Sequence, residues 1–350
     1  MRRPTIADIA QRAGVTKAAV SFALNGQPGV SAATRERILA IAHEVGFQPN
    51  SAARALTAGK AEAFGLVIDR PARTLGIEPY FMQLVSGIQA ELAQQHVTLL
   101  FTMAEDQDAE IELYRQWWAQ RRVDGVIVVD LQLNDRRIAV LEKLHMPAVV
   151  IGTPLGAGSL PAVWQDDRAA VKEVVSHLAG LGHQRIARVG GFSRYWHSTL
   201  RSEAFAQVAA EAGLDALSVE ADYTAEHGAQ ATRGLLGSAE PPTAILYDND
   251  VMAAAGLGAA QRLGISVPSG VSIVSWDDSA LCELMHPSLT ALRRDIAAAG
   301  TQAARMLQQM AAGQQPANFQ EAPAVLEIRD SSGVAGVPQI TGSRRSRLTA

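Results

Sequence analysis

The residues with the clearest chemistry lie on one face of a short predicted helix near the N-terminus. At about 100° per residue, one arc of this helix, the reading arc, carries Lys17, Ala18, Ser21, Phe22 and Asn25. The arc contains no acid, whereas a helix that needs only solubility would carry Glu and Lys. Its cation, small polar groups and aromatic ring suit phosphate groups and base edges. The plainer interpretation is an ordinary helical hairpin with a poorly charged face.

A second group of polar residues follows predicted strands much later in the chain. These residues are Asp69-Arg70, Asp130, Asp166, Asp248-Asn249 and Trp276-Asp277. Ligands of parallel sheets bind at the carboxyl ends of the strands, so these side chains are expected to converge on one cleft. Carboxylates, amides and aromatic rings together can hydrogen-bond hydroxyls and stack on a sugar face. Any one of these residues, taken alone, is more often a helix cap or half of a surface ion pair.

Motifs of the common enzyme classes are missing. The sequence has no GxxxxGK[ST], HExxH or GxSxG, and Gly256-Leu257-Gly258 lacks the third glycine of a dinucleotide fingerprint. Cys282 is the single cysteine, which excludes an intrachain disulfide and a cysteine-based zinc site and predicts a small buried hydrophobe. We therefore expect no enzyme activity, no cofactor and no metal.

Three short helices are predicted to hold the reading arc in place. Thr5 and Asp8 have the spacing of a capping box, and Gly14 suits the positive φ of a tight turn between helices. Thr16 is expected to cap the second helix and Ser31 the third. An apolar core then follows from Ile6, Ile9, Ala10, Val20, Ala23, Leu24, Ile38, Ile41, Ala42 and Val45.

Charge is distributed unevenly along the 350 residues. The net charge is −4, with 48% hydrophobic and 19% charged residues, a composition typical of globular domains. Residues 1–60 carry eight Lys and Arg against three acids, while the remainder carries 23 basic and 32 acidic residues. A basic head on an acidic body indicates a polyanionic ligand for the head alone.

Residues 50–58 form an alanine-rich segment that favours a helix. Nine residues are too few to stay helical in water without a partner, so the segment is expected to fold only on docking. Leu56 is its one large apolar side chain. One interpretation has Leu56 packed onto the next domain.

From Ala63 onwards, predicted strands alternate with predicted helices. The strands are 64–69, 97–101, 124–130, 147–152, 162–165, 185–189, 243–247 and 271–276, with a closing strand at 320–329. The helices are 80–95, 109–120, 135–145, 169–181, 200–212, 226–236 and 251–263. Such alternation predicts parallel sheets with helices on both faces. Two successive sheets would make a bilobal body with a cleft between the lobes.

The composition of the two ends of the chain predicts where the protein is found and where its folded part stops. The N-terminus lacks the apolar run of a signal peptide, and no stretch is long and uncharged enough to span a membrane, so we expect a cytoplasmic protein. The segment from Ser331 to Ala350 has three arginines and no acid after Ser331. It is predicted to be a solvated tail, with an extra DNA contact as the alternative.

Four blocks carry a family resemblance: TIADIAQRAGVTKAAVSFALNG, VSAATRERI, GFQPNSAARAL and VWQDDRAAVKEVVSHLAGLGHQRIA. They resemble the LacI/GalR family of bacterial transcriptional repressors, from about Thr5 to Arg329. The resemblance implies an N-terminal all-α helix-turn-helix domain plus an α/β bilobal periplasmic-binding-protein-like domain of two doubly wound parallel sheets. The expected parts are residues 1–48 for the helix-turn-helix domain, 49–60 for a hinge helix and linker, 61–330 for effector binding and dimerisation, and 331–350 for a disordered basic tail.

The resemblance also implies how DNA is bound. Paired hinge helices would enter the minor groove, where Leu56 wedges between base pairs and Ala53 allows the helices to approach each other. The predicted DNA-binding residues are Thr5, Thr16, Lys17, Ala18, Ser21, Phe22, Asn25, Ser31, Asn50, Ala53 and Leu56. Phe22 stands where most relatives carry Arg, and Ala18 and Ala19 are unusually small. The usual base contact at Phe22 is therefore in doubt.

The family's effector site is carried over residue by residue to this chain. The predicted effector-binding residues are Arg70, Phe81, Asp166, Arg201, Tyr223, Asn249, Trp276 and Asp277. Phe81 could equally be a core residue, and Tyr223 rests on a loose alignment. The implied function is a homodimeric or larger repressor of a near-palindromic double-stranded operator, controlled by a sugar. A nucleobase or nucleoside effector is the alternative, and a free-standing carbohydrate-binding protein is a more distant one.

Overall fold

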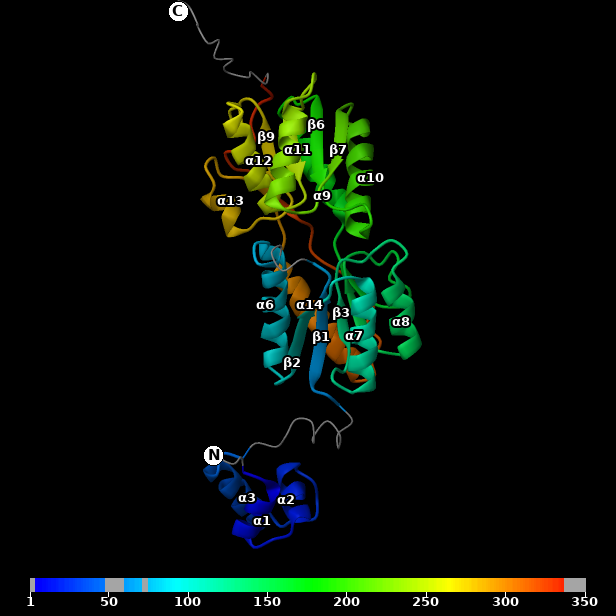
Figure 1. Ribbon diagram of the computed structural model, residues 1–350, viewed down its shortest axis with the longest axis vertical. Coiled ribbons are helices and arrows are strands. Elements are labelled where there is room, and N and C mark those ends of the chain that lie inside the picture. Colours follow the sequence, from blue (N-terminus) through cyan, green and yellow to red (C-terminus); the bar gives the residue numbers. More distant parts are fainter. Residues whose placement is uncertain (1–3, 48–59, 71–74, 337–350) are drawn as a thin grey trace, which may run out of the picture. The chain divides into compact units, whose positions relative to one another are not determined.

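The computed structural model describes residues 4–47, 60–70 and 75–336, and it divides into two units, Met1–Glu62 and Ala63–Ala350 (Figure 1). Most of the predicted hinge, including Asn50, Ala53 and Leu56, lies outside the described residues.

The first unit contains three helices, α1 (Ile6–Ala13), α2 (Lys17–Leu24) and α3 (Ala32–Glu44). Their predicted starts are confirmed. The Thr5 side chain and Asp8 form both halves of a capping box, because the Thr5 amide donates to Asp8 Oδ2 at 2.8 Å. Gly14 ends α1 with φ 64°. Thr16 accepts from the amide of Ala19 at 3.1 Å, which caps α2.

Ser31 caps α3 in the same way, by accepting from the Thr34 amide at 3.3 Å. The predicted apolar faces meet in one small core, with Ile9, Ala10, Ala13, Val20, Ala23, Ile38 and Ala42 buried. Arg35 ties α3 to the end of α2, since its guanidinium donates to the carbonyls of Ala23 and Gln27. The order and burial of these helices match the pattern predicted from local sequence.

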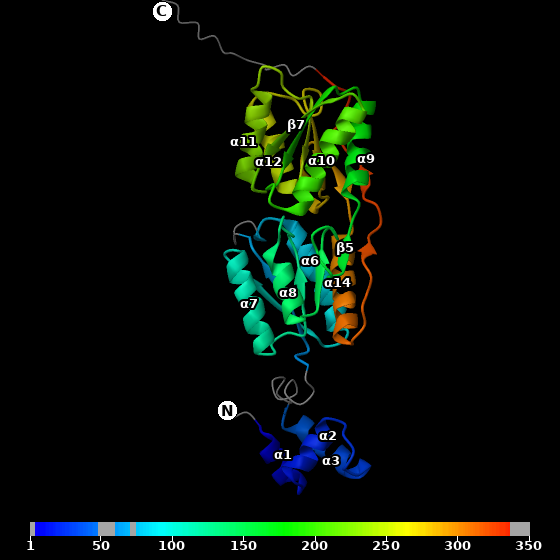
Figure 2. The same ribbon diagram turned by 90° about the vertical axis from the view of Figure 1, so that its right-hand side faces the viewer.

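The second unit has two lobes, each built on a six-stranded sheet (Figure 2). The first sheet has the order β11-β5-β4-β3-β1-β2 and is parallel throughout. Its strands are β1 (Ala63–Ile68), β2 (Thr98–Met103), β3 (Val126–Val128), β4 (Ala148–Ile151), β5 (Ala162–Trp164) and β11 (Phe319–Gln320). Its helices are α6 (Pro79–Ala93), α7 (Gln107–Ala119), α8 (Arg136–Leu144) and α14 (Ile296–Ala311). Helices α6 and α14 cover one face of this sheet, while α7 and α8 cover the other.

The second sheet has the order β12-β10-β9-β8-β6-β7, and only β12 runs antiparallel to its neighbour among the pairs described. Its strands are β6 (Arg185–Gly190), β7 (Asp215–Glu220), β8 (Ala244–Tyr247), β9 (Ser272–Ser275), β10 (Thr290–Arg293) and β12 (Val325–Glu327). Its helices are α9 (Asp167–Gly180), α10 (Trp196–Glu211), α11 (Ala225–Leu236), α12 (Asp250–Arg262) and the short α13 (Ala280–Leu284). Helices α9 and α10 pack on one face of the sheet, with α11 and α12 on the other.

The lobes are not successive along the chain, which corrects the sequence interpretation. After β10 the chain returns to the first lobe as α14, continues into β11 at the edge of the first sheet, and then enters the second sheet as β12. The single closing strand predicted at 320–329 is therefore replaced by two short strands in different sheets. Strands β7 and β10 and helices α13 and α14 were not predicted. Strand β10 and helix α13 are only four and five residues long, whereas the apolar face of α14 is a signal that the sequence analysis did not use.

Helix α14 packs very closely against α6, as Figures 1 and 2 show. A Cβ atom on Gly87 would lie 1.8 Å from the carbonyl oxygen of Ala297, and one on Gly300 would lie 2.4 Å from that of Leu84. Two glycines therefore permit this contact, which joins segments far apart in the sequence.

Two further expectations concern the single cysteine and the C-terminal end. Cys282 is buried, as predicted. Ser331 is also buried, and its hydroxyl donates to the carbonyl of Ile273 at 2.6 Å. Residues 331–336 thus belong to the second lobe, and the solvated tail predicted from Ser331 is wrong for them because their backbone and hydroxyl groups pair with its sheet. Residues 337–350 lie outside the described part. Among the described helices, none is long and apolar enough to cross a bilayer.

Candidate functional site

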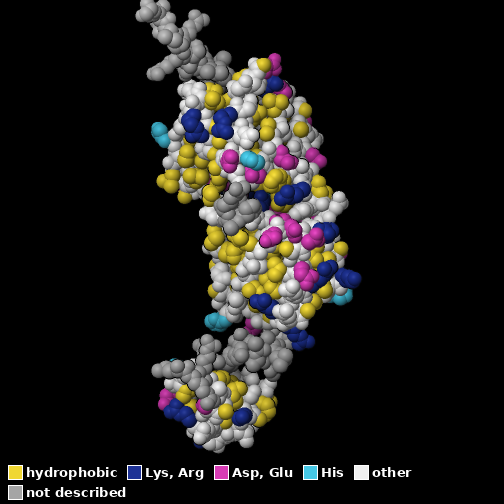
Figure 3. Space-filling view, viewed as in Figure 1, with side chains coloured by type: hydrophobic (Ala, Val, Ile, Leu, Met, Phe, Trp, Pro, Cys, Tyr) yellow, Lys and Arg dark blue, Asp and Glu magenta, His cyan; other side chains and the backbone are white. Residues whose placement is uncertain are grey.

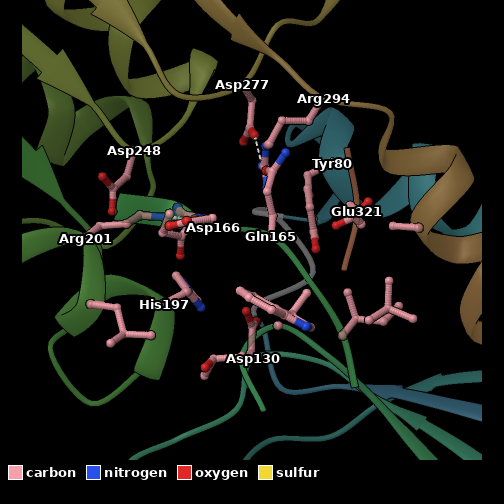
Figure 4. Close-up of a pocket in the computed structure, with 18 of the residues that line it drawn as sticks. Tyr80, Asp130, Gln165, Asp166, His197, Arg201, Asp248, Asp277, Arg294 and Glu321 are labelled. Carbon is pink, nitrogen blue, oxygen red and sulfur yellow. Dashed lines mark hydrogen bonds and ion pairs between the residues drawn. The ribbon is translucent and has the colours of Figure 1, made fainter. Parts of the chain in front are cut away.

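A cavity of about 490 Å³ lies between the two lobes (Figure 4). Both lobes line it, and its volume falls within the ~300–1,000 Å³ range of small-molecule sites. The cavity brings together the predicted residues Arg70, Phe81, Asp166, Arg201, Tyr223 and Asp277. The carboxyl ends of the strands meet there, as the sequence predicted.

Arginines in the cavity are paired with carboxylates. Arg70 donates from Nε to Asp130 Oδ2 at 2.8 Å, and Arg294 forms an ion pair with Asp277. Arg201 lies 3.4 Å from Asp167. Burial disfavours an isolated charge, so each guanidinium is held by a carboxylate partner. An anionic ligand would have to compete with these carboxylates.

The Trp276 ring packs against the guanidinium of Arg201. The guanidinium carbon lies 4.2 Å from the Trp276 ring centroid, a cation–π contact that orients its plane. Trp276 is fully buried and is not among the residues that line the cavity, so the structure does not bring it there with the other predicted residues. Its ring fills the core beneath Arg201 instead. Arg201 Nε lies 3.4 Å from Asp167 Oδ1 and, among the described residues, makes no hydrogen bond beyond this ion pair.

Asn249 is also buried and is not among the residues that line the cavity. Its Oδ1 accepts from the Met252 amide at 2.8 Å and caps α12. Its Nδ2 donates to the Tyr223 carbonyl at 3.1 Å and to Glu78 Oε1 at 3.3 Å. These bonds occupy the amide, which explains why it links neighbouring segments instead of facing the cavity.

Three other predicted residues lie at the cavity in different ways. Asp166 is exposed and caps α9, because its Oδ1 accepts from the Ala169 amide at 3.0 Å. Phe81 lines the cavity and also packs in the core of the first lobe, so its core role is confirmed and its contact with an effector stays a prediction. Tyr223 is buried, and its hydroxyl bonds to His197 Nε2 at 2.7 Å.

Several residues that line the cavity were missed by the sequence analysis. They are Glu78 and the residues Tyr80, Gln165, His197, Arg294 and Glu321, which Figure 4 labels. Glu78 directly precedes Pro79 at the start of α6, and it makes no side-chain cap bond there. An acid at this position that is buried and does not cap the helix indicates a role in the cavity. The sequence could not show this, because it does not reveal that Glu78 is buried.

Burial shifts the protonation of two of these missed residues. Burial and the nearby Arg201 lower the pKa of His197 to about 3, so its imidazole is neutral at physiological pH. Burial raises the pKa of Glu78 to about 7, against the opposing influence of Arg70 and Asn249. Within the described part of the chain, Glu78 Oε2 and Gln165 Oε1 have no hydrogen-bond partner. The cavity therefore offers acceptors as well as donors.

The reading arc of the first unit is accessible. Lys17, Ala18, Phe22 and Asn25 are exposed and Ser21 is half-buried, with Asn25 Nδ2 donating to Ser21 Oγ at 3.3 Å. Phe22 retains 39% exposure while one ring edge packs near Gly29. The capping bonds of Thr5, Thr16 and Ser31 occupy these hydroxyls in shaping the helices.

On the face shown in Figure 3, basic and acidic side chains of the second unit are interspersed with hydrophobic ones. Such a mixed surface gives no single-sign patch for a polyanion on that face.

Comparisons with known proteins match both units. The family model described as bacterial regulatory proteins, lacI family, matches residues 5–50, and that of a periplasmic binding protein-like domain matches residues 175–332. The HTH-type transcriptional regulator AglR of Rhizobium meliloti (strain 1021) is 33% identical over 312 residues, which cover 85% of each chain.

Two solved structures are similar over almost the full chain. The lac repressor dimer bound to operator and the anti-inducer ONPF superposes with a TM-score of 0.85 at 26% identity, covering 95% of this chain and 100% of that chain. The complex of the transcriptional regulator CelR with cellobiose superposes with a TM-score of 0.72 at 27% identity, covering 94% and 100%.

Proposed function

Because the chain belongs to the lacI family of bacterial regulatory proteins and is a DNA-binding transcriptional regulator and not an enzyme, we propose that it is a repressor whose operator affinity is set by a sugar bound between its lobes. The repressor acts as a homodimer, because two reading arcs on a near-palindromic operator supply the affinity that one short helix lacks.

The observation that carries the sugar assignment is the pairing of charges around the cavity. Arg70, Arg201 and Arg294 each lie beside a carboxylate, so a phosphate or carboxylate ligand finds no free cation among them. Glu78 Oε2 and Gln165 Oε1 have no hydrogen-bond partner among the described residues, and Arg201 Nε has only its 3.4 Å contact with Asp167. Sugar hydroxyls both donate and accept, so a neutral polyol satisfies both kinds of group. The cellobiose complex of CelR supports the same ligand class.

The DNA assignment rests on the reading arc. Its largely exposed, acid-free surface is presented by a helix that Thr16 caps, so the exposed Lys17 and Phe22 can reach phosphates and base edges. Lys17 supplies a phosphate contact, and Phe22 contacts a thymine methyl group or the sugar-phosphate backbone.

Isothermal calorimetry of the full chain tests the effector class. Neutral mono- and disaccharides, their phosphates and uronates, and nucleosides form the panel. We expect binding by a neutral sugar and none by its phosphate. Binding of nucleosides alone would replace the sugar with the nucleoside alternative.

Coupling to DNA is tested with the sugar that binds. The sugar and the operator must change each other's affinity by the same factor, typically about 5–150-fold. Arg201→Ala and Asp277→Ala are expected to abolish the sugar response while leaving operator affinity without sugar near wild type. Loss of operator binding together with a lower melting temperature would instead make these two residues structural.

A further inference from the structure

Arg70 makes contacts across the cavity that differ from those of a ligand-binding arginine. It extends from the end of β1 in the first lobe, and its guanidinium carbon lies 4.8 Å from the ring centroid of Tyr195 and 4.4 Å from that of Tyr223. Both tyrosines belong to the second lobe. Arg70 is 6% exposed, and Asp130 of its own lobe holds its Nε. A desolvated cation over aromatic faces is a strong contact for its size.

The backbone joins the lobes at the same place. The amide of Leu133 donates to the carbonyl of Arg194 at 2.8 Å, and the amide of Trp196 donates to the carbonyl of Leu131 at 2.9 Å. Gln132 and Tyr195 therefore face each other in a short antiparallel bridge between lobes. Tyr195 is thus fixed by its backbone to the first lobe while its ring lies under Arg70.

Both lobes are shaped for this contact at some cost in local geometry. Asp130 and Tyr223 have positive φ values of 51° and 68°, which non-glycine residues seldom adopt. Gly191 leaves room for the Tyr223 ring, because a Cβ there would lie 1.8 Å from the tyrosine hydroxyl. The buried guanidinium of Arg137 donates to the Asp130 carbonyl at 3.0 Å and holds the strained loop.

His197 connects the two tyrosines to the cavity. Its ring stacks on Tyr195 with centroids 5.5 Å apart and an interplanar angle of 9°, and its Nε2 bonds to the Tyr223 hydroxyl. It also lines the cavity (Figure 4). A neutral imidazole can occupy this place beside Arg70 without charge repulsion, which agrees with its lowered pKa.

We propose that Arg70, Tyr195 and Tyr223 form a clasp that holds the two lobes together, with His197 as the member that senses a ligand in the cavity. The inference rests on the proposed function, since the clasp regulates the same cavity. Arg70 is then a positioning residue of the effector response and not an effector contact. A ligand against His197 shifts the tyrosines and thereby changes how firmly Arg70 is held.

Distance measurements between spin labels on the two lobes test the clasp without ligand or DNA. Ala119→Cys on α7 and Arg233→Cys on α11 provide exposed labelling sites, and the native Cys282 is buried. Labelled chain is diluted with unlabelled chain so that distances within one subunit dominate. The parent should show one narrow distance distribution.

Arg70→Met combined with Asp130→Asn removes the cation without leaving a buried carboxylate unpaired. We expect a longer lobe distance whose population rises at least about tenfold, because the cation–π contacts are lost. Arg70→Lys is the second variant: it keeps the charge but lacks the planar guanidinium, so the longer distance should also grow. Adding Tyr223→Leu to the Arg70 variant should increase the population of the longer distance only slightly, because both substitutions remove the same contact.

Arg194→Met is the matched control. Arg194 also lies 4.8 Å from the Tyr195 ring centroid, but within the second lobe and exposed. Its loss should leave the distance unchanged. Parent-like distances in both Arg70 variants, or equal lengthening in the Arg194 variant, would overturn the clasp. Neither result bears on operator or sugar binding, so a failure of the proposed function is recognised separately by calorimetry.

Discussion

The reading arc and the interlobe cavity place their polar side chains in opposite environments. On the reading arc, Lys17, Phe22 and Asn25 are exposed and come from a single helix and its cap. Around the cavity, Arg70 and Glu78 are buried, and the lining extends along the chain as far as Glu321. An exposed side chain contributes binding energy only when a partner binds, whereas a buried charge must already be paired within the folded protein. Substitutions on the reading arc should therefore change DNA binding without changing the stability of the fold. Substitutions of buried charges in the second unit should change ligand binding and stability together.

The largest expected effect is on the buried ion cluster behind the cavity. Arg137 pairs with Glu110 at 2.9 Å and Asp135 at 2.7 Å, and it is almost fully buried. Arg137→Met leaves two buried carboxylates without their cation, so urea unfolding should show a loss of about 3–5 kcal/mol. Arg136→Met is the control, because the neighbouring Arg136 forms an exposed pair with Asp108 and should contribute only about 0–1 kcal/mol. Equal losses in the two variants would break the comparison.

The next effect is a pH dependence from Glu78. Burial raises its pKa to about 7 from 4.5, so the folded protein holds this proton more tightly than the unfolded chain. Below pH 4.5 the carboxyl is protonated in both states. Stability is lost as the pH rises from about 4.5 through 7, and the loss is constant above that range.

Glu78→Gln removes this titration. Relative to the parent, the variant should gain up to about 3 kcal/mol in unfolding free energy between pH 4.5 and pH 8. Unfolding in urea across this range measures the gain. Glu173→Gln, on the exposed side of α9, serves as control and should track the parent. A parent-like pH profile for Glu78→Gln would show that its carboxyl is not desolvated.

A smaller and purely intermolecular effect is expected on the reading arc. Lys17→Ala should weaken operator binding and lower the slope of log affinity against log salt by about one, since one phosphate contact is lost. Its unfolding free energy should stay within about 0.5 kcal/mol of the parent because the side chain is exposed. Lys172→Ala in the second unit should leave the salt slope unchanged. Operator binding that does not depend on salt would remove the reading arc as the DNA surface.

The smallest expected change is in the base sequence that the protein prefers in its operator. Arg can donate two hydrogen bonds to guanine, whereas Phe22 cannot, so Phe22→Arg should shift the preferred half-site towards guanine at one position. Selection from a randomised operator library compares the two proteins. The same selected site for both would place Phe22 outside the base-reading surface.

The first unit could be predicted almost completely from its sequence. The capping pairs Thr5 with Asp8 and Ser31 with Thr34 span three residues, and Gly14 marks the turn by its own backbone freedom. Local spacing also places the reading arc opposite the buried Val20 and Ala23. These features depend on contacts within a turn or two of helix, which adjacent residues decide.

The cavity could be predicted only as a place where strand ends meet. Sequence spacing located Asp130 and Asp277 there. It also predicted Asn249 and Trp276 as effector contacts, whereas the structure buries both of them outside the cavity lining. Whether an amide or a ring faces the cavity depends on neighbours from other segments, such as Glu78 for Asn249 and Arg201 for Trp276. No local pattern encodes these neighbours.

The three capped helices, the acid-free reading arc, the alternation of strands and helices, and the family all follow from the amino-acid sequence. The tertiary structure alone decided that α14 returns to the first lobe, that Glu78 and His197 face the cavity, and that Arg70 reaches across to two tyrosines. The physical reason is the range of the interactions. Caps and helix faces follow from residues a few positions apart, whereas burial and charge pairing arise only when distant segments exclude water together.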